Sequence, residues 1–235
     1  MARRKSGELK LDGDQAPTED VPSWQKRSLD RSLQGARMRA QERSDRFVTA
    51  ALELLAERED TDLTIQDVVD HSEMSLRTFY TFFDGKDSLL LAVYETILSK
   101  TAVPMLRERC EVGPDPVLRL KALLEGMAEL TAMPAPLARA LSVFHLRLAE
   151  TRPRDLRHAM EPLRRLITDM LTEVAAVGRL RDDLDLSTQA ALLQELLIAS
   201  AHSAVLAGGR QTSTDDLWAF CSAAMLRRGE AADAE

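Results

Sequence analysis

Residues 75–83 carry the side chains best suited to chemistry, in a pattern typical of a short amphipathic helix. One face of this predicted helix carries four polar residues, with a leucine at its edge: Arg77, Thr78, Tyr80, Thr81 and Leu76. An arginine can donate paired hydrogen bonds to a guanine edge, a threonine methyl group can contact thymine, and hydroxyl groups can bind phosphates. The face therefore suits DNA, although a polar helix face that only meets water has the same composition.

Two helix starts in quick succession position this face. Thr64 followed by Asp67 is an N-cap signature, because the hydroxyl accepts an unpaired backbone N–H and the carboxylate suits the positive end of the helix dipole. Ser75 begins a second helix in the same manner, and Asp84 with Gly85 ends it. Two short helices joined by so short a connection predict a helix-turn-helix.

The same stretch resembles the N-terminal signature of TetR-family transcriptional regulators, over the region from about Phe47 to Leu91. The resemblance rests on the hydrophobic pattern of residues 64–69 and on six spaced residues: Ser75, Thr78, Tyr80, Phe83, Lys86 and Leu89. It implies that the second helix enters the major groove and that Tyr80 and Lys86 bind phosphates. It also implies that a helical ligand-binding and dimerisation domain follows.

Two residues depart from that signature: Glu73 stands where the family usually has glycine in the turn, and Phe82 where it often has histidine. Glycine takes positive φ freely, so Glu73 is expected to affect the turn, and Phe82 removes a polar contact. The residues expected to bind DNA are Arg39, Arg43, Ser75, Leu76, Arg77, Thr78, Tyr80, Thr81 and Lys86.

Composition favours helices. The 235 residues are 45% hydrophobic but only 4% aromatic, with few glycines and prolines, which argues for an all-α fold over a β-sandwich. The net charge of −7 argues against a non-specific nucleic-acid binder, because such proteins present a broad basic surface. Between Trp24 and Arg46, however, basic residues outnumber acidic ones, so positive charge is concentrated just ahead of the motif.

Catalytic and metal chemistry find no support in the spacing of reactive residues. The four histidines, His71, His145, His158 and His202, lie far apart, and no HxxxH, CxxC, GxSxG or GxGxxG pattern occurs. The sequence therefore predicts no catalytic residues, no metal site, no cofactor and no enzyme. A helical-bundle enzyme is the less favoured alternative.

Features of location point to the cytoplasm. No apolar run approaches the roughly 20 residues needed to span a bilayer, and the charged N-terminus lacks the apolar core of a signal peptide. Cys110 and Cys221 are too few for a disulfide framework, which fits a reducing compartment. We therefore expect a cytoplasmic protein with no membrane partner.

The predicted organisation has four parts. Residues 1–35 form a partly disordered N-terminal arm, with an extra short helix over 23–33 that Gly35 ends. Residues 36–86 form the three-helix DNA-binding domain, whose first helix ends at Glu57 and carries Arg39 and Arg43 on one polar stripe. Residues 87–229 form the ligand-binding and dimerisation domain, and 230–235 a tail.

Proline and aspartate positions predict the helix ends of the second domain. Asp87 and Asp115 are expected to cap helices, the second with Pro116 in its first turn. Pro104 is expected to kink or shorten its helix, and Pro162 to bend the helix that begins at Arg152.

The last two helices, predicted over 187–207 and 214–228, predict a homodimer. The first is apolar around nearly its whole circumference, so it must be buried on all sides. Two copies forming a four-helix interface would bury it. The alternative is a monomer with a deep C-terminal core.

A small-molecule site is expected between the middle helices. An apolar cavity with a few polar anchors is the usual form of such a site, and methionines adapt to varied ligands. The candidate lining residues are Met127, Phe144, His145, Met160 and Met170. Each could instead be ordinary core.

These patterns predict an all-α homodimer with an N-terminal helix-turn-helix. By resemblance, it would be a repressor that leaves a palindromic double-stranded DNA operator when a small apolar or amphipathic effector binds. The alternative is an all-α protein that binds or sequesters a small molecule without reading DNA.

Overall fold

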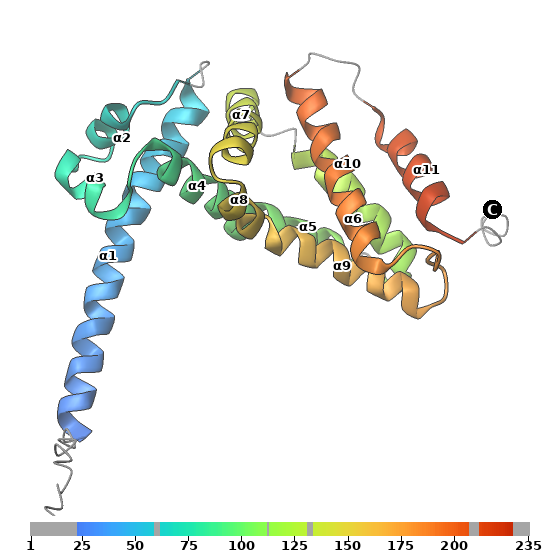
Figure 1. The fold of residues 1–235 in the computed structure, drawn as a ribbon, viewed down its shortest axis with the longest axis horizontal. Coiled ribbons are helices and arrows are strands. Elements are labelled where there is room, and N and C mark those ends of the chain that lie inside the picture. Colours follow the sequence, from blue (N-terminus) through green and yellow to red (C-terminus); the bar gives the residue numbers. More distant parts are fainter. Residues whose placement is uncertain (1–22, 59–61, 112, 131–133, 207–211, 228–235) are drawn as a thin grey trace, which may run out of the picture. The chain divides into compact units, whose positions relative to one another are not determined.

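The structure is a computed structural model that describes residues 23–58, 62–111, 113–130, 134–206 and 212–227 (Figure 1). Of the described residues, 83% are helical and none lies in a strand, which confirms the all-α prediction. The first helices are α1 (Ser23–Glu57), α2 (Ile65–His71), α3 (Leu76–Phe82), α4 (Lys86–Ile97), the π-helical turn η1 (Leu98–Ala102) and α5 (Val103–Arg109). The remaining helices are α6 (Pro116–Leu130), α7 (Ala135–Thr151), α8 (Pro153–Ala159), α9 (Glu161–Ala176), α10 (Leu186–Leu206) and α11 (Thr214–Met225).

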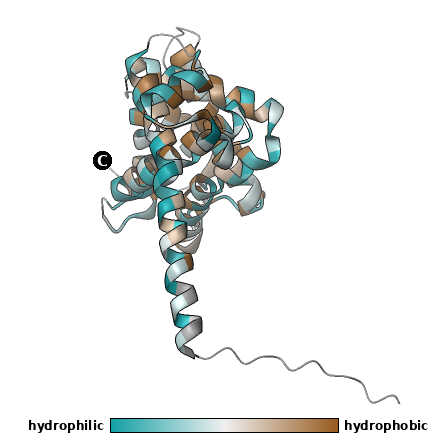
Figure 2. Cartoon of the chain, turned by 90° about the vertical axis from the view of Figure 1, so that its left-hand side faces the viewer, coloured by the Kyte–Doolittle hydropathy of each residue, from teal (hydrophilic) through white to brown (hydrophobic). Residues whose placement is uncertain are grey.

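The chain divides after Glu42 into two units, and the described part of the first is the N-terminal portion of α1. Its residues are mostly hydrophilic or neutral (Figure 2). The expected end of a separate short helix at Gly35 is wrong, because α1 continues through that residue. A glycine in a helix costs only about 1 kcal/mol, and the neighbouring alanines, arginines and leucine favour helix. The predicted end of this helix at Glu57 is confirmed.

The head, which comprises the end of α1, helices α2 and α3 and the start of α4, is built around three phenylalanine rings. The ring of Phe47, from α1, meets the rings of Phe79 and Phe83 edge-on at centroid distances of 5.4 and 6.1 Å. Both Phe47 and Phe79 are fully buried. Leu63 and Val68, on either side of the Thr64 cap, are buried in the same cluster. The head core therefore fixes α2 and α3 against the end of α1.

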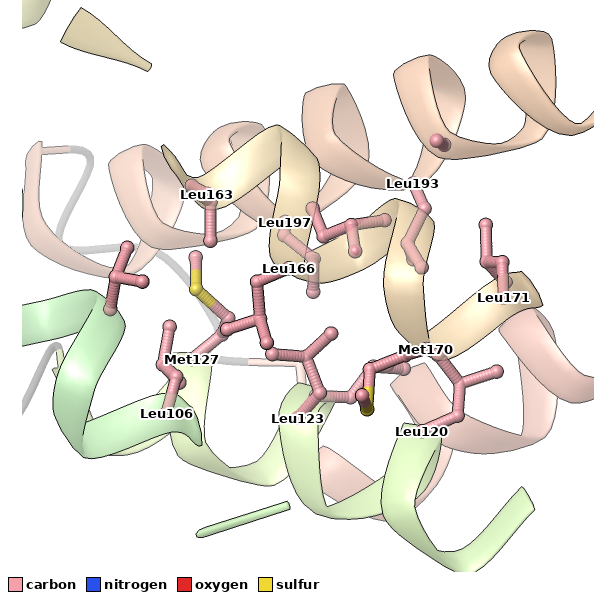
Figure 3. Close-up of a cluster of buried hydrophobic side chains, with 14 of the residues drawn as sticks. Leu106, Leu120, Leu123, Met127, Leu163, Leu166, Met170, Leu171, Leu193 and Leu197 are labelled. Atoms are coloured by element: carbon pink, nitrogen blue, oxygen red, sulfur yellow. The ribbon is translucent and has the colours of Figure 1, made fainter. Parts of the chain in front are cut away.

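A second cluster forms the core of the body, which comprises the chain from the second half of α4 to α11. Figure 3 shows its leucines and methionines converging from α5, α6, α9 and α10, among them Leu106, Leu123, Leu166 and Leu197. Leu106, Leu123 and Leu166 are fully buried. The body is thus a bundle in which α9 packs against α6 and α10.

Helices α4 and α7 belong to both clusters. The start of α4 places Leu89 and Leu90 in the head core, and its second half places Tyr94 in the body core. From α7, Phe144 packs in the head core, whereas Leu148 packs in the body core. These two helices also contact each other, so they join head and body through continuous packing.

Two expectations about helix ends and bends need correction. Asp87 does not cap α4, since Gly85 precedes the helix and Asp87 lies in its first turn, where it pairs with Arg147. Pro162 does not bend one long helix, because the helix is interrupted at Met160 and Pro162 lies in the first turn of the next helix, α9. A proline is tolerated in a first turn, where its missing N–H has no helical partner.

The predictions at Pro104 and at Asp115 agree with the structure. Around Pro104 the helix changes to the π-helical turn η1 before α5 begins, which accommodates the missing N–H without ending the run. The predicted cap of α6 is confirmed, because the backbone N–H of Val117 donates to Asp115 Oδ1 at 2.9 Å.

The run from Lys86 to Arg109 is, by length and composition alone, apolar enough to cross a membrane. This differs from the expectation from sequence that no apolar run is long enough to span a bilayer. The buried residues in Lys86–Arg109, however, face the two cores described above. The core helix of a globular protein has the same composition, so the run carries little weight as a membrane span.

The turn between α2 and α3 is a Schellman motif with glutamate in its left-handed position. Glu73 has φ of 54°, its N–H donates to the Asp70 carbonyl at 3.2 Å, and the Met74 N–H donates to the Val69 carbonyl at 3.3 Å. Met74 packs against the head core beside Val69. The turn that glycine usually makes is therefore kept, with backbone strain at Glu73.

Replacing Glu73 by glycine should stabilise the protein. We expect Glu73→Gly to raise the free energy of unfolding by about 0.5–1 kcal/mol, because relief of left-handed strain exceeds the added entropy of the unfolded chain. Urea denaturation measures the change. The matched control is Glu150→Gly in α7, which should lower stability by about 1 kcal/mol. Equal destabilisation by both variants would contradict the strain at Glu73.

Candidate functional site

Helix α3 is held by a cap that occupies several of its hydroxyl groups. The Ser75 Oγ accepts the backbone N–H of Thr78 at 3.1 Å and lies 2.8 Å from Thr78 Oγ1. Thr81 Oγ1 donates to the Arg77 carbonyl at 3.1 Å. These hydroxyl groups mainly stabilise the helix. The methyl groups of the two threonines and the remaining lone pairs of the oxygens stay available to a ligand.

Two long side chains of α3 project outward. Tyr80 is 56% exposed and its ring meets buried Phe79 edge-on at 5.4 Å, so the ring is supported on one side. Arg77 is exposed as well. Neither side chain has a hydrogen-bond partner among the described residues, whereas Leu76, 43% exposed, adds an apolar edge. Arg77 and Tyr80 therefore present long polar groups to solvent on α3.

Helix α2 is anchored by a complete capping box, as the sequence predicts. The Asp67 carboxylate accepts hydrogen bonds from the Thr64 backbone N–H at 3.0 Å and from Arg58 Nη1 at 2.9 Å. The Arg58 hydrogen bond, followed by those from Thr64, holds the pKa of Asp67 well below its usual range. The cap stays charged at neutral pH and fixes the start of α2.

The other residues predicted to bind DNA differ in their exposure and in the partners of their side chains. Lys86 lies at the start of α4, with its ammonium nitrogen 3.5 Å from Asp62 Oδ1. Arg39 and Arg43 are exposed, one turn apart on α1. Arg46, on the same polar stripe, instead donates to the Ser72 carbonyl at 3.0 Å and helps to hold the turn. Phe82 is half-buried against the head core, away from a DNA-reading role.

A mostly apolar cavity of about 120 Å³ lies in the body between α4, α6, α7 and α10. Met127 and Met160 line it, as the sequence suggested, together with leucines and alanines. Phe144 and Met170 lie elsewhere, Phe144 in the head core and Met170 in the body core. His145 does not line the cavity but lies directly behind two residues that do, Tyr94 and His202.

Three polar lining residues escaped the sequence reasoning: Tyr94, Ser142 and His202. They sit on α4, α7 and α10, far apart in the chain, so no local spacing brings them together. The sequence spacing of His202 tests it only as a zinc ligand. A polar residue on an otherwise apolar helix face was the one signal that could have marked Tyr94.

These residues form a small polar cluster. The Tyr94 hydroxyl lies 2.8 Å from His145 Nδ1 and 3.2 Å from Met160 Sδ, and the rings of His145 and His202 have centroids 5.0 Å apart. Burial, and then the neighbouring His202, lower the pKa of His145 to about 4. Burial also lowers the pKa of His202 and raises that of Tyr94. At neutral pH the cluster is therefore uncharged.

The described residues include no group of three or more side chains that could hold a metal ion. Among the described residues, no carboxylate is hydrogen-bonded to either histidine of the cluster, and the cavity is lined mainly by apolar side chains.

Residues 47–93 match the family described as "Bacterial regulatory proteins, tetR family". Thermus thermophilus FadR, a TetR-family transcriptional repressor solved in complex with lauroyl-CoA, is 26% identical, with a TM-score of 0.63 over 82% of this chain and 100% of that one. A TetR transcription regulator from Haloarcula marismortui is 22% identical, with a TM-score of 0.61 over 80% and 100% of the two chains. RolR, solved with resorcinol, is 19% identical, with a TM-score of 0.62 over 80% and 89%.

No curated protein sequence matches the chain. The matched segment contains both capped helices, the Schellman turn and the exposed face of α3, and the similar folds extend over the body. Residues 47–93 are therefore similar to the N-terminal segment of the TetR family of bacterial regulatory proteins, and the fold of the chain is similar to that of solved TetR-family regulators.

Proposed function

We propose that this protein is a cytoplasmic transcriptional regulator that binds an operator through α3 and is released by a small effector. The observation that carries the proposal is the exposed pair Arg77 and Tyr80 on a helix locked by its cap and by Phe79. A rigid helix with an arginine and a tyrosine pointing outward suits the major groove, where arginine reads guanine. Lys86 and the basic residues Arg39 and Arg43 would add phosphate contacts.

A homodimer through α10 and α11 would supply the second reading helix. Leu192 on α10 is 54% exposed and Phe220 on α11 is 65% exposed, although both are large and apolar. Each stays in contact with water in a single chain, which a second copy packed on these helices would prevent. Two heads held in this way would contact half-sites about 34–36 Å apart, or a multiple of that distance, on a palindromic operator.

The cavity is the proposed effector site. Two proteins of similar fold were solved with lauroyl-CoA and with resorcinol, a long acyl thioester and a small ring. The repressor role is proposed because the Thermus thermophilus relative is a repressor. An effector that binds the DNA-released conformation more tightly shifts the population toward it, which is sufficient for control.

Helix α7 supplies a route from cavity to head. Leu141 and Ser142 line the cavity, whereas Phe144, half a turn further on, packs in the head core. Two ion pairs tie the same region to the head: Arg147 Nε to Asp87 Oδ1 at 2.6 Å, and Arg152 Nη2 to Asp84 Oδ2, also at 2.6 Å. A shift of α7 on effector binding would therefore move the residues that hold α3 and α4.

A binding or sequestering protein without DNA recognition is the competing proposal, which the cavity supports equally well. The two differ only in the role of α3. Measurement of DNA binding therefore decides between them.

Removal of either projecting α3 side chain should weaken operator binding. We expect Arg77→Ala to lower the affinity for the operator by about tenfold to a hundredfold, because it loses a base or phosphate contact. Tyr80→Phe, which removes only the hydroxyl, should lower this affinity by about three- to tenfold. The operator is first selected from a random oligonucleotide pool, and affinity is then measured by fluorescence anisotropy. Arg154→Ala, an exposed arginine on α8, is the matched control and should bind as the wild type does. Failure of the wild type to select any oligonucleotide would favour the sequestering protein, and unchanged affinity in Arg77→Ala would contradict the role given to α3.

Charge on the exposed faces of α10 and α11 should separate the subunits. We expect Leu192→Glu and Phe220→Glu each to raise the dimer dissociation constant by about a hundredfold or more, because burying an unpaired carboxylate costs several kcal/mol. Sedimentation velocity over a concentration series measures the change. Leu118→Glu, on a 55% exposed leucine of α6, is the control and should remain dimeric. A wild-type chain that sediments as a monomer would defeat the proposal.

A further inference from the structure

Building on the effector role proposed above, we propose that the cavity takes an uncharged molecule about one ring in size. A hydroxyl or carbonyl group of the molecule would be held by Ser142 and His202. The inference concerns the chemical class of the ligand, and it rests on the size of the cavity, its lack of charge and its unpaired polar groups.

Size limits the ligand first. The cavity measures about 120 Å³, somewhat below the roughly 150 Å³ of an apolar protein cavity that holds benzene. A single substituted ring is therefore near the upper limit. The opening of the cavity toward the surface leaves room for a small substituent, but a long acyl chain would require the surrounding helices to separate.

Charge limits the ligand next. None of the residues that line the cavity is an arginine, lysine, aspartate or glutamate. A carboxylate or ammonium group entering it would lose its hydration without gaining a counter-ion, which is strongly unfavourable. His202 is the one lining residue that could become cationic, and burial disfavours its protonated form. The cavity therefore selects against charged heads of either sign.

The polar groups specify what the ligand carries. Ser142 is 7% exposed, and neither its hydroxyl nor the His202 ring has a hydrogen-bond partner among the described residues. Both atoms remain accessible within the cavity, and an unpaired buried polar group is unfavourable until something binds it. A hydroxyl and a neutral imidazole can each donate and accept, which suits a phenol, an alcohol or a ketone.

Ser142 on α7 and His202 on α10 both line the cavity. Ser142 and His145 are three residues apart, so they lie on the same side of α7. The His145 ring meets the ring of His202 from α10 at 5.0 Å, and its other contact is to the Tyr94 hydroxyl. Tyr94 and His145 thus form a hydrogen-bonded pair, and the His145 ring packs against the ring of His202. The ligand's polar group would meet Ser142 and His202 beside that pair.

The test compares three probes of one ring, phenol, toluene and benzoate, by calorimetric titration of the full-length protein at neutral pH. We expect phenol to bind at least about tenfold more tightly than benzoate, because only benzoate brings a charge. In His202→Leu and Ser142→Ala, phenol should bind about five- to tenfold more weakly while toluene binds as well as before, because only phenol loses a hydrogen bond.

His158→Leu, at an exposed histidine of α8, is the control and should bind all three probes as the wild type does. Thermal melting of each variant checks that it is folded, and Ser142→Ala keeps the test decisive if His202→Leu is unstable. Tighter binding of benzoate than of phenol, an equal loss of phenol and toluene in both variants, or no binding of any probe would overturn the inference. Phenol binding that leaves operator affinity unchanged would instead overturn the effector role and keep the chemical class of the cavity.

Discussion

Shared packing of α4 and α7 is the constraint on which the rest of this structure depends. Each helix contributes buried side chains to both hydrophobic clusters, Leu90 and Tyr94 from α4, and Phe144 and Leu148 from α7. Close-packed interiors deform little, so a displacement at one end of either helix must be repacked at the other. The DNA-binding head is therefore not a freely hinged module, and its orientation is coupled to the state of the body.

The polar cluster beside the cavity illustrates how a helical bundle acquires selectivity. Apolar lining alone would accept any hydrophobic molecule of suitable size, because the hydrophobic effect is not directional. Tyr94 and His145 are paired with each other, and in the proposal made above Ser142 and His202 are the side chains that discriminate. Their neutrality follows from burial, which lowers the pKa of both histidines. The same helices that connect to the head thus carry the groups that would recognise an effector.

Comparison of prediction with structure separates local from distant interactions. The capping box at Thr64, the cap at Ser75 and the cap at Asp115 were predictable, because each involves hydrogen bonds within three residues. The expected helix end at Gly35 and the expected bend at Pro162 were wrong, since a single glycine is outweighed by its helical neighbours and the proline is accommodated in a first turn. Asp87 found a partner in Arg147, 60 residues away, which no local pattern indicates.

The sequence alone determined the all-α architecture, the helix-turn-helix and the outward position of Tyr80, because caps and helical periodicity are short-range properties. Only the tertiary structure decided which polar side chains meet. Tyr94 bonds to His145 across 51 residues of chain, and Phe144, expected beside the ligand, turned instead into the head core. The helical period gives the relative angle of residues on one helix but not the direction in which the helix faces its neighbours. That direction is set by how the helices of the bundle pack together, and it is what defines the cavity.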